Sequence, residues 1–241
     1  MEQTQAGTVE QSQQMSALSG VLQVLFAPSK VFASVRQMPN WILPLIIFTA
    51  LVVIVTLILY PTIRTEILNN VTNNPDLNEE QRAQLAEQVS GRLTLGWILG
   101  PGLVFQLIIY FVVAAVFFFV ANILMGGEGK FTQMLSVAGL SQMVMIPEDL
   151  VKVPMILVKQ TIKVHTDLSL FLPTSMEESF VFRLLSQLDI FTFWKVFLIG
   201  LGTAVVYKFT NKKAMTAVFV VWGIYILLAA LMGKFLKFGM G

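Results

Sequence analysis

Two acids and a lysine stand between two prolines in the segment MIPEDLVKVP. Lys152 follows Glu148 by four residues and Asp149 by three, so on one helix both carboxylates can reach the ammonium group. Pro147 comes directly before the acids and suits the first turn of a helix, where exposed N–H groups also favour carboxylates. Pro154 predicts a kink if that helix continues through it.

The medium around this segment decides what its charges can do. If a membrane helix breaks at Pro147, the charges lie inside a helical bundle, where such groups line a polar path or pair with one another. Lys195 on the next apolar segment is then a candidate partner. The resulting intramembrane polar network would consist of Glu148, Asp149, Lys152 and Lys195.

A second interpretation places the same charges at the membrane surface. Glu148 follows Phe131 by about 25 Å of helix at 1.5 Å per residue, which is close to the thickness of the hydrocarbon core. The acids would then begin an amphipathic helix that lies along the interface and needs no function. We favour this interpretation and keep the buried network as the alternative.

The composition identifies the medium. Of the 241 residues, 56% are hydrophobic and 12% are charged, whereas soluble domains carry about a quarter charged residues. Too few charges are present to cover a water-soluble fold of this size, so we predict an integral membrane protein surrounded by a lipid bilayer. The formal net charge of +2, without a basic run, gives no indication of nucleic-acid binding.

Several chemistries lack the residues they need. The chain has no cysteine and a single histidine, His165, so thiol nucleophiles, iron–sulfur clusters, thiolate zinc sites and histidine-rich metal sites are not expected. The sequence contains neither a G-x-S-x-G nor an H-E-x-x-H motif. We therefore predict no catalytic residues, no metal and no cofactor, and expect the protein not to be an enzyme.

The hydrophobic pattern predicts an all-α fold, a polytopic membrane helical bundle. About twenty apolar residues cross a hydrocarbon core of roughly 30 Å. Five stretches meet this requirement, at about residues 41–60, 97–125, 131–158, 191–209 and 214–233.

The remaining segments are assigned by polarity. Residues 1–17 are polar and lack the basic and apolar regions of a signal peptide, so we expect a disordered N-terminus before a membrane domain at 41–238. Residues 18–40 carry an apolar stripe at helical spacing, which predicts an amphipathic helix. That stripe could lie in the membrane interface or pack on the protein's own bundle.

Two polar excursions separate the apolar stretches. In residues 61–95 we expect a helix that Asn78 caps and Gly91 stops. A second excursion covers residues 165–189. The glycine-rich GGEGKF, residues 126–131, lacks the Lys-Ser/Thr of a phosphate-binding loop and is interpreted as a turn between membrane helices.

Small residues four positions apart mark candidate helix-packing faces. Gly96 and Gly100 form a GxxxG pair at the start of the second span, and Gly200 and Ala204 form a similar pair in the fourth. Small residues at this spacing allow helices to approach closely within the membrane.

Charge also bears on the orientation. A cytoplasmic N-terminus places the short basic connections inside and both acid-bearing excursions outside, although the outer segments hold at least as many Lys and Arg residues. We expect this orientation, which puts the C-terminus outside because the number of spans is odd.

Three segments resemble the Yip1-domain family of membrane proteins. They are LFAPSKVFASVRQMPNWILPL (25–45), GGEGKFTQMLSVAGLS (126–141) and FTFWKVFLIGLGTAVVYKFTNKKA (191–214), and their order and spacing extend the resemblance over roughly residues 25–235. The resemblance implies a bundle of five helices with a cytoplasmic N-terminus. The short polar N-terminus and the excursion at 61–95 are more similar to prokaryotic members, which implies the cytoplasmic (plasma) membrane.

The resemblance also bears on partners. Eukaryotic members are associated with Rab GTPases through an acidic Asp-Leu-Tyr-Gly-Pro motif, but the equivalent region here reads RQMPNWILP, so Rab binding is not expected. We instead expect a non-enzymatic scaffold or accessory partner of membrane machinery for transport or trafficking, associated with another membrane protein or with a second copy. The alternative function is a transporter or channel whose path is lined by the intramembrane polar network.

Overall fold

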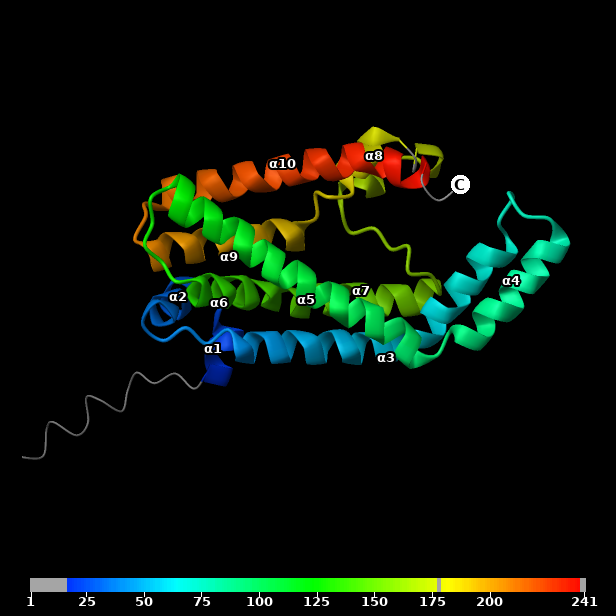
Figure 1. Cartoon of the computed structure of the whole chain (residues 1–241), viewed down its shortest axis with the longest axis horizontal. Coiled ribbons are helices and arrows are strands. Elements are labelled where there is room, and N and C mark those ends of the chain that lie inside the picture. Colours follow the sequence, from blue (N-terminus) through cyan, green and yellow to red (C-terminus); the bar gives the residue numbers. More distant parts are fainter. Residues whose placement is uncertain (1–16, 177–178, 239–241) are drawn as a thin grey trace, which may run out of the picture.

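Five long apolar helical segments form the body of the molecule in the computed structural model, which describes residues 17–176 and 179–238 (Figure 1). The expected disordered segment, apart from Ala17, lies outside the described residues. Each of the five is long and apolar enough to cross a membrane, and the described residues include no β-strand. The predicted all-α membrane bundle is confirmed. The five segments are Ile42–Thr72, Leu95–Leu124, Phe131–Lys159, Ile190–Tyr207 and Asn211–Met232.

The helices divide these segments as follows. The first segment is α3 (Ile42–Thr72), and the second joins α5 (Leu95–Phe119) to a π-helical turn, Val120–Leu124. The third consists of α6 (Phe131–Ser141), a 3-10 turn at Gln142–Val144, and α7 (Met145–Lys159). The last two are α9 (Ile190–Tyr207) and α10 (Asn211–Phe238). The shorter helices are α1 (Ala17–Gln23), α2 (Pro28–Gln37), α4 (Glu79–Arg92) and α8 (Phe180–Leu185), with 3-10 turns at Leu168–Phe171 and Thr174–Met176.

The first excursion differs from the sequence-based expectation at two points. Helix α3 continues through Pro61 to Thr72 instead of ending near residue 60, because one proline removes a single N–H donor without preventing the helix from resuming. Helix α4 begins as predicted, with the side chains of Asn78 and Gln81 each accepting the other's backbone N–H at 2.8 and 3.0 Å. Gly91 lies inside α4 and does not stop it.

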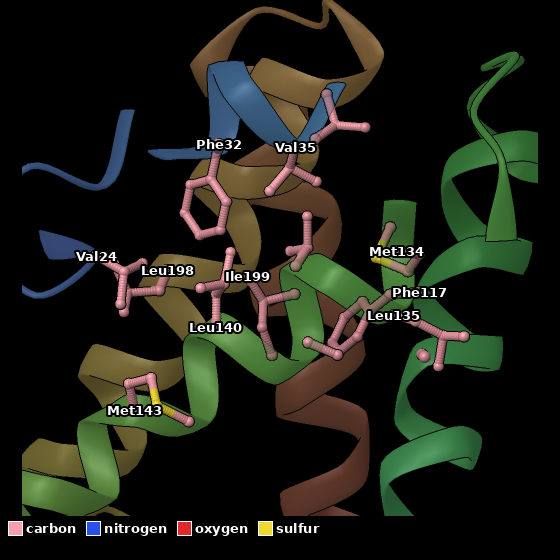
Figure 2. Close-up of a cluster of buried hydrophobic side chains, with 14 of the residues drawn as sticks. Val24, Phe32, Val35, Phe117, Met134, Leu135, Leu140, Met143, Leu198 and Ile199 are labelled. Atoms are coloured by element: carbon pink, nitrogen blue, oxygen red, sulfur yellow. The ribbon is translucent and has the colours of Figure 1, made fainter. Parts of the chain in front are cut away.

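Two of the five segments are inner and three are outer. We compare the most apolar stretch of 18 residues in each segment. In the α6–α7 segment and in α9, 56% of this stretch is buried, against 17% in α3 and α10 and 22% in α5. Figure 2 shows the centre of the core, where Leu140 of α6 lies near Leu198 and Ile199 of α9. The broad apolar surfaces of the outer helices require lipid as their surroundings.

Helix α2 uses its apolar stripe within the molecule. Val31, Phe32 and Val35 are buried against α9 and α6, while Lys30 and Arg36 remain exposed. The Arg36 carbonyl accepts a hydrogen bond of 2.8 Å from the Gln133 side chain of α6. The apolar stripe was expected either to lie in the membrane interface or to pack on the bundle. Its α2 part packs on the protein's own bundle.

Glycines allow α9 to be approached closely from two sides. A Cβ atom at Gly202 would lie 2.6 Å from Val137 of α6 and 3.1 Å from the Phe32 ring of α2. A Cβ atom at Gly200 would lie 2.5 Å from the Met215 sulfur of α10. The absence of side chains at these positions therefore sets the distance of α9 from its neighbours.

Replacing Gly202 with alanine is expected to destabilise the bundle by about 1–3 kcal/mol, because the new methyl group overpacks a filled core. Unfolding of the purified protein by SDS in mixed micelles measures the loss. The matched control is Gly223→Ala in α10, where a Cβ atom would meet no other atom within 4 Å. Equal losses in the two variants would contradict the close approach.

Candidate functional site

The charged segment of the sequence lies at a change in helix geometry. The third apolar segment tightens to a 3-10 turn at Gln142–Val144 and resumes as α7, with Pro147 in its first turn. Figure 1 shows α7 continuing along the line of α6. Pro154 lies inside α7, which runs on to Lys159 and ends at Gln160 in the left-handed conformation, φ 53°.

Glu148, Lys152 and Asp189 form a chain of ion pairs that joins α7 to the start of α9. The Lys152 ammonium lies 2.6 Å from a Glu148 oxygen and 3.4 Å from a carboxylate oxygen of Asp189. The lysine and glutamate side chains are 26% and 21% exposed, and that of Asp189 is 6% exposed. This partial burial reduces screening by water, so the removal of one partner is expected to cost more here than on an open surface.

Two hydrogen bonds also hold the Asp189 side chain. It caps α9 by accepting the Phe191 N–H at 2.7 Å, and its other oxygen accepts the Thr166 hydroxyl at 2.5 Å. Burial alone raises the pKa of Asp189, but these hydrogen bonds and the charge of Lys152 outweigh it and hold the pKa below its ordinary value. The carboxyl is therefore ionised at neutral pH and completes the cluster.

The remaining predicted network residues take different positions. Asp149 does not pair with Lys152, and its Oδ2 atom is buried with no hydrogen-bond partner among the described residues. Lys195 is half-buried, within electrostatic reach of Glu148, Lys152 and Asp189, but forms no ion pair in the described part of the chain. The four predicted residues thus lie near one another, although only Glu148 and Lys152 are joined directly.

Sequence reasoning missed Asp189 and Thr166. Asp189 stands directly before the fourth apolar stretch, and this position for an aspartate is the usual signal of a helix N-cap. That signal identifies the cap but not the pairing with Lys152, because the approach of residue 189 to α7 depends on how the second excursion folds back.

A serine, histidine and aspartate lie close together in that excursion but do not form a catalytic triad. The Nδ1 atom of His165 lies 3.4 Å from Asp167 and 3.2 Å from the Ser169 hydroxyl, so one ring nitrogen faces both groups. A triad uses the two ring nitrogens separately. Ser169 also donates directly to Asp167 and is 1% exposed. Within residues 17–176 and 179–238, no group of acids and histidine is arranged to hold a metal ion.

The candidate packing glycines fall into two groups. Gly200 and Ala204 are buried in α9. Gly96 and Gly100 are exposed on α5, and a Cβ atom at either would meet no other atom of the described chain within 4 Å.

The comparison with known protein families gives a match over most of the chain. The family model of the Yip1 domain matches residues 22–232. The chain belongs to the Yip1-domain family. The resemblance seen in the sequence is confirmed, and the Yip1 domain extends from α1 into α10. No curated protein and no solved structure matches the chain significantly.

Removing the central charge of the cluster is expected to destabilise this Yip1-domain protein. Lys152→Met leaves Glu148 and Asp189 without their shared cation, at a cost of about 1–3 kcal/mol for a partly buried pair. SDS unfolding in mixed micelles measures the change. Lys163→Met is the control, because Lys163 is 63% exposed and lies 3.9 Å from Glu66, so its loss should cost below about 1 kcal/mol. Equal effects would show that the cluster contributes no more than a surface ion pair.

Proposed function

We propose that this Yip1-domain protein is a non-enzymatic scaffold or accessory partner of other membrane proteins in transport or trafficking. The observation that carries the proposal is the exposed glycine pair on α5. Gly96 and Gly100 lie one helical turn apart, and side-chain-free backbone at this spacing accepts a second helix at short distance. The partner is another membrane protein or a second copy of the chain.

The contrast with α9 supports this interpretation. Gly200 and Gly202 are filled by neighbours from the same chain, so their small size is accounted for by the fold. The α5 glycines have no such neighbour among the described residues, and glycine lowers helix stability relative to alanine by about 1 kcal/mol in an aqueous helix interior. An intermolecular contact accounts for the two glycines where packing within the chain does not.

The proposal includes an orientation in the prokaryotic cytoplasmic (plasma) membrane. The N-terminus is cytoplasmic and the C-terminus lies outside. Support comes from the orientation that the family resemblance implies, and from the short basic connections between the helices, which lie at the same end as α2.

A photo-crosslinker on α5 is expected to capture a partner. The chain has no cysteine, so Val104→Cys, one turn beyond Gly100 on the same helix face and 59% exposed, introduces a single thiol that a benzophenone maleimide labels in isolated membranes without altering the glycines. Irradiation should give a discrete higher-mass product, identified by mass spectrometry as a homodimer or a defined heterocomplex. Leu228→Cys is the control, since Leu228 is 53% exposed on another outer helix. The same products from both positions, or none from position 104, would count against the proposal.

A second candidate function has its own supporting observation. The buried, unpartnered Oδ2 of Asp149 beside the Glu148–Lys152 pair is the kind of group that lines an ion or proton path. Against it, two cavities of about 470 and 430 Å³ lie at the other end of the bundle, and none of the four network residues lines either.

Reconstituted vesicles separate the two functions. We expect liposomes that contain the protein to remain impermeable in assays with pH-sensitive and ion-sensitive dyes. The transport function predicts flux that Glu148→Gln abolishes and Lys163→Met leaves intact, and that result would replace the scaffold proposal.

A further inference from the structure

The end of the bundle remote from the Glu148–Lys152–Asp189 cluster is strongly basic. Figure 1 shows that α2, the α5–α6 connection and the α9–α10 turn all lie at this end. Residues 24–40, 120–131 and 207–214 of this end contain six cations and one acid, Glu128. The cations are Lys30, Arg36, Lys130, Lys208, Lys212 and Lys213.

These cations are not neutralised within the described chain. All six side chains are exposed, and the ion pairs found among the described residues all lie elsewhere. Lys213 is positioned by a hydrogen bond of 2.9 Å to the Met125 carbonyl and lies 4.5 Å above the Phe209 ring, but neither contact cancels its charge. The positive field of this end is therefore directed outward.

Two of the cations line a cavity of about 470 Å³. Arg36 comes from α2 and Lys208 from the end of α9, and Glu128 and the backbone of residues 126–129 complete much of the wall. A cavity of this size suits a small polar ligand. A neighbouring cavity of about 430 Å³ is lined by Lys212 and Lys213.

The wall of the larger cavity is fixed by packing. A side chain at Gly127 or Gly129 would overlap the Tyr207 ring, so the glycine-rich turn lies directly on that ring. Asn122 connects the ring to the turn. Its side chain donates a hydrogen bond to the Tyr207 hydroxyl at 3.2 Å and accepts one from the Gly129 N–H at 3.0 Å. The cavity is thus a built feature of the helix ends and not a gap between mobile loops.

Exposed apolar side chains beside the cations favour a phospholipid over a soluble anion as the ligand. Phe26 and Met38 flank α2 and are 86% and 66% exposed. Apolar side chains next to Lys and Arg at the end of membrane helices are typical of the bilayer interface, where the side chains enter the acyl region and the cations reach phosphates. A soluble anion would not require this apolar rim, whereas a phospholipid contacts both parts.

We propose that this basic end binds anionic phospholipids and that Arg36 and Lys208 hold the phosphate of one headgroup in the larger cavity. Glu128, on the same wall, repels that phosphate and limits the affinity. The inference is independent of the scaffold proposal, because it requires neither a protein partner nor the glycines of α5.

Native mass spectrometry of the full chain in detergent, titrated with phosphatidylglycerol, tests the proposal. Arg36→Gln with Lys208→Gln should weaken binding about 25-fold, because each basic residue near an anionic lipid contributes about fivefold. Gln160 already occupies the left-handed conformation that Lys208 adopts, so the new glutamine fits that backbone. The control removes the same charges from the other end with Arg92→Gln and Lys159→Gln, both at exposed positions, and should leave the affinity unchanged.

A gain of affinity provides the second measurement. Glu128→Gln removes the repulsion and should tighten phosphatidylglycerol binding about fivefold, a result that misfolding cannot produce. Phosphatidylcholine should bind at least about tenfold more weakly than phosphatidylglycerol, and inorganic phosphate at equal concentration should not displace the lipid. Equal loss in the two double variants, equal binding of the two lipids, displacement by phosphate, or no gain in Glu128→Gln would each overturn the proposal.

Discussion

Close packing around α9 is the constraint on which the rest of the structure depends. This helix of 18 residues spans about 27 Å, close to the minimum for crossing the hydrocarbon core. Gly202 faces α6 and α2, and Gly200 faces α10, so three helices are positioned by the absence of side chains on one. Since lipid is as apolar as the helix surfaces, the hydrophobic effect adds little to this association, and packing must supply it. The bundle is consequently sensitive to a methyl group at Gly202, where the short side chain of Val137 cannot move aside as the flexible Met215 can at Gly200.

The two ends of α9 meet water in opposite ways. At its start, Asp189 caps the helix and pairs with Lys152, so the charge of this carboxylate is compensated within the chain. At its end, Tyr207 anchors the glycine-rich turn through Asn122, and Lys208 is left exposed beside it. One end therefore ties helices together, while the other presents uncompensated positive charge to whatever lies at the membrane boundary. The same short helix thus begins at a polar cluster and ends at an exposed cation.

Features set by local chemistry could be predicted from the sequence. The five apolar stretches, the Asn78 cap of α4 and the turn at residues 126–130 follow from hydropathy, capping and glycine content, and each is present. Helix ends were less predictable: α3 passes through Pro61 because a helix can resume beyond a missing donor. The spacing predicted the pairing of Lys152 with Glu148, but its second partner, Asp189, could not be predicted, since Asp189 is 37 residues away and reaches Lys152 only through the fold of the second excursion.

The outer helices have one further feature that bears on function, the exposed glycine pair of α5. Burial of α6 and α9 leaves α3, α5 and α10 with largely exposed apolar surfaces, and lipid alone satisfies most of that area. Lipid does not require glycine, however, and a Cβ atom at position 96 or 100 would meet no neighbouring element of the described chain within 4 Å. The exposed pair on α5 is thus a feature that neither the fold nor the bilayer accounts for. The lateral association through α5 that we propose accounts for it, and it would leave the charged cluster and the basic end free to keep their separate roles.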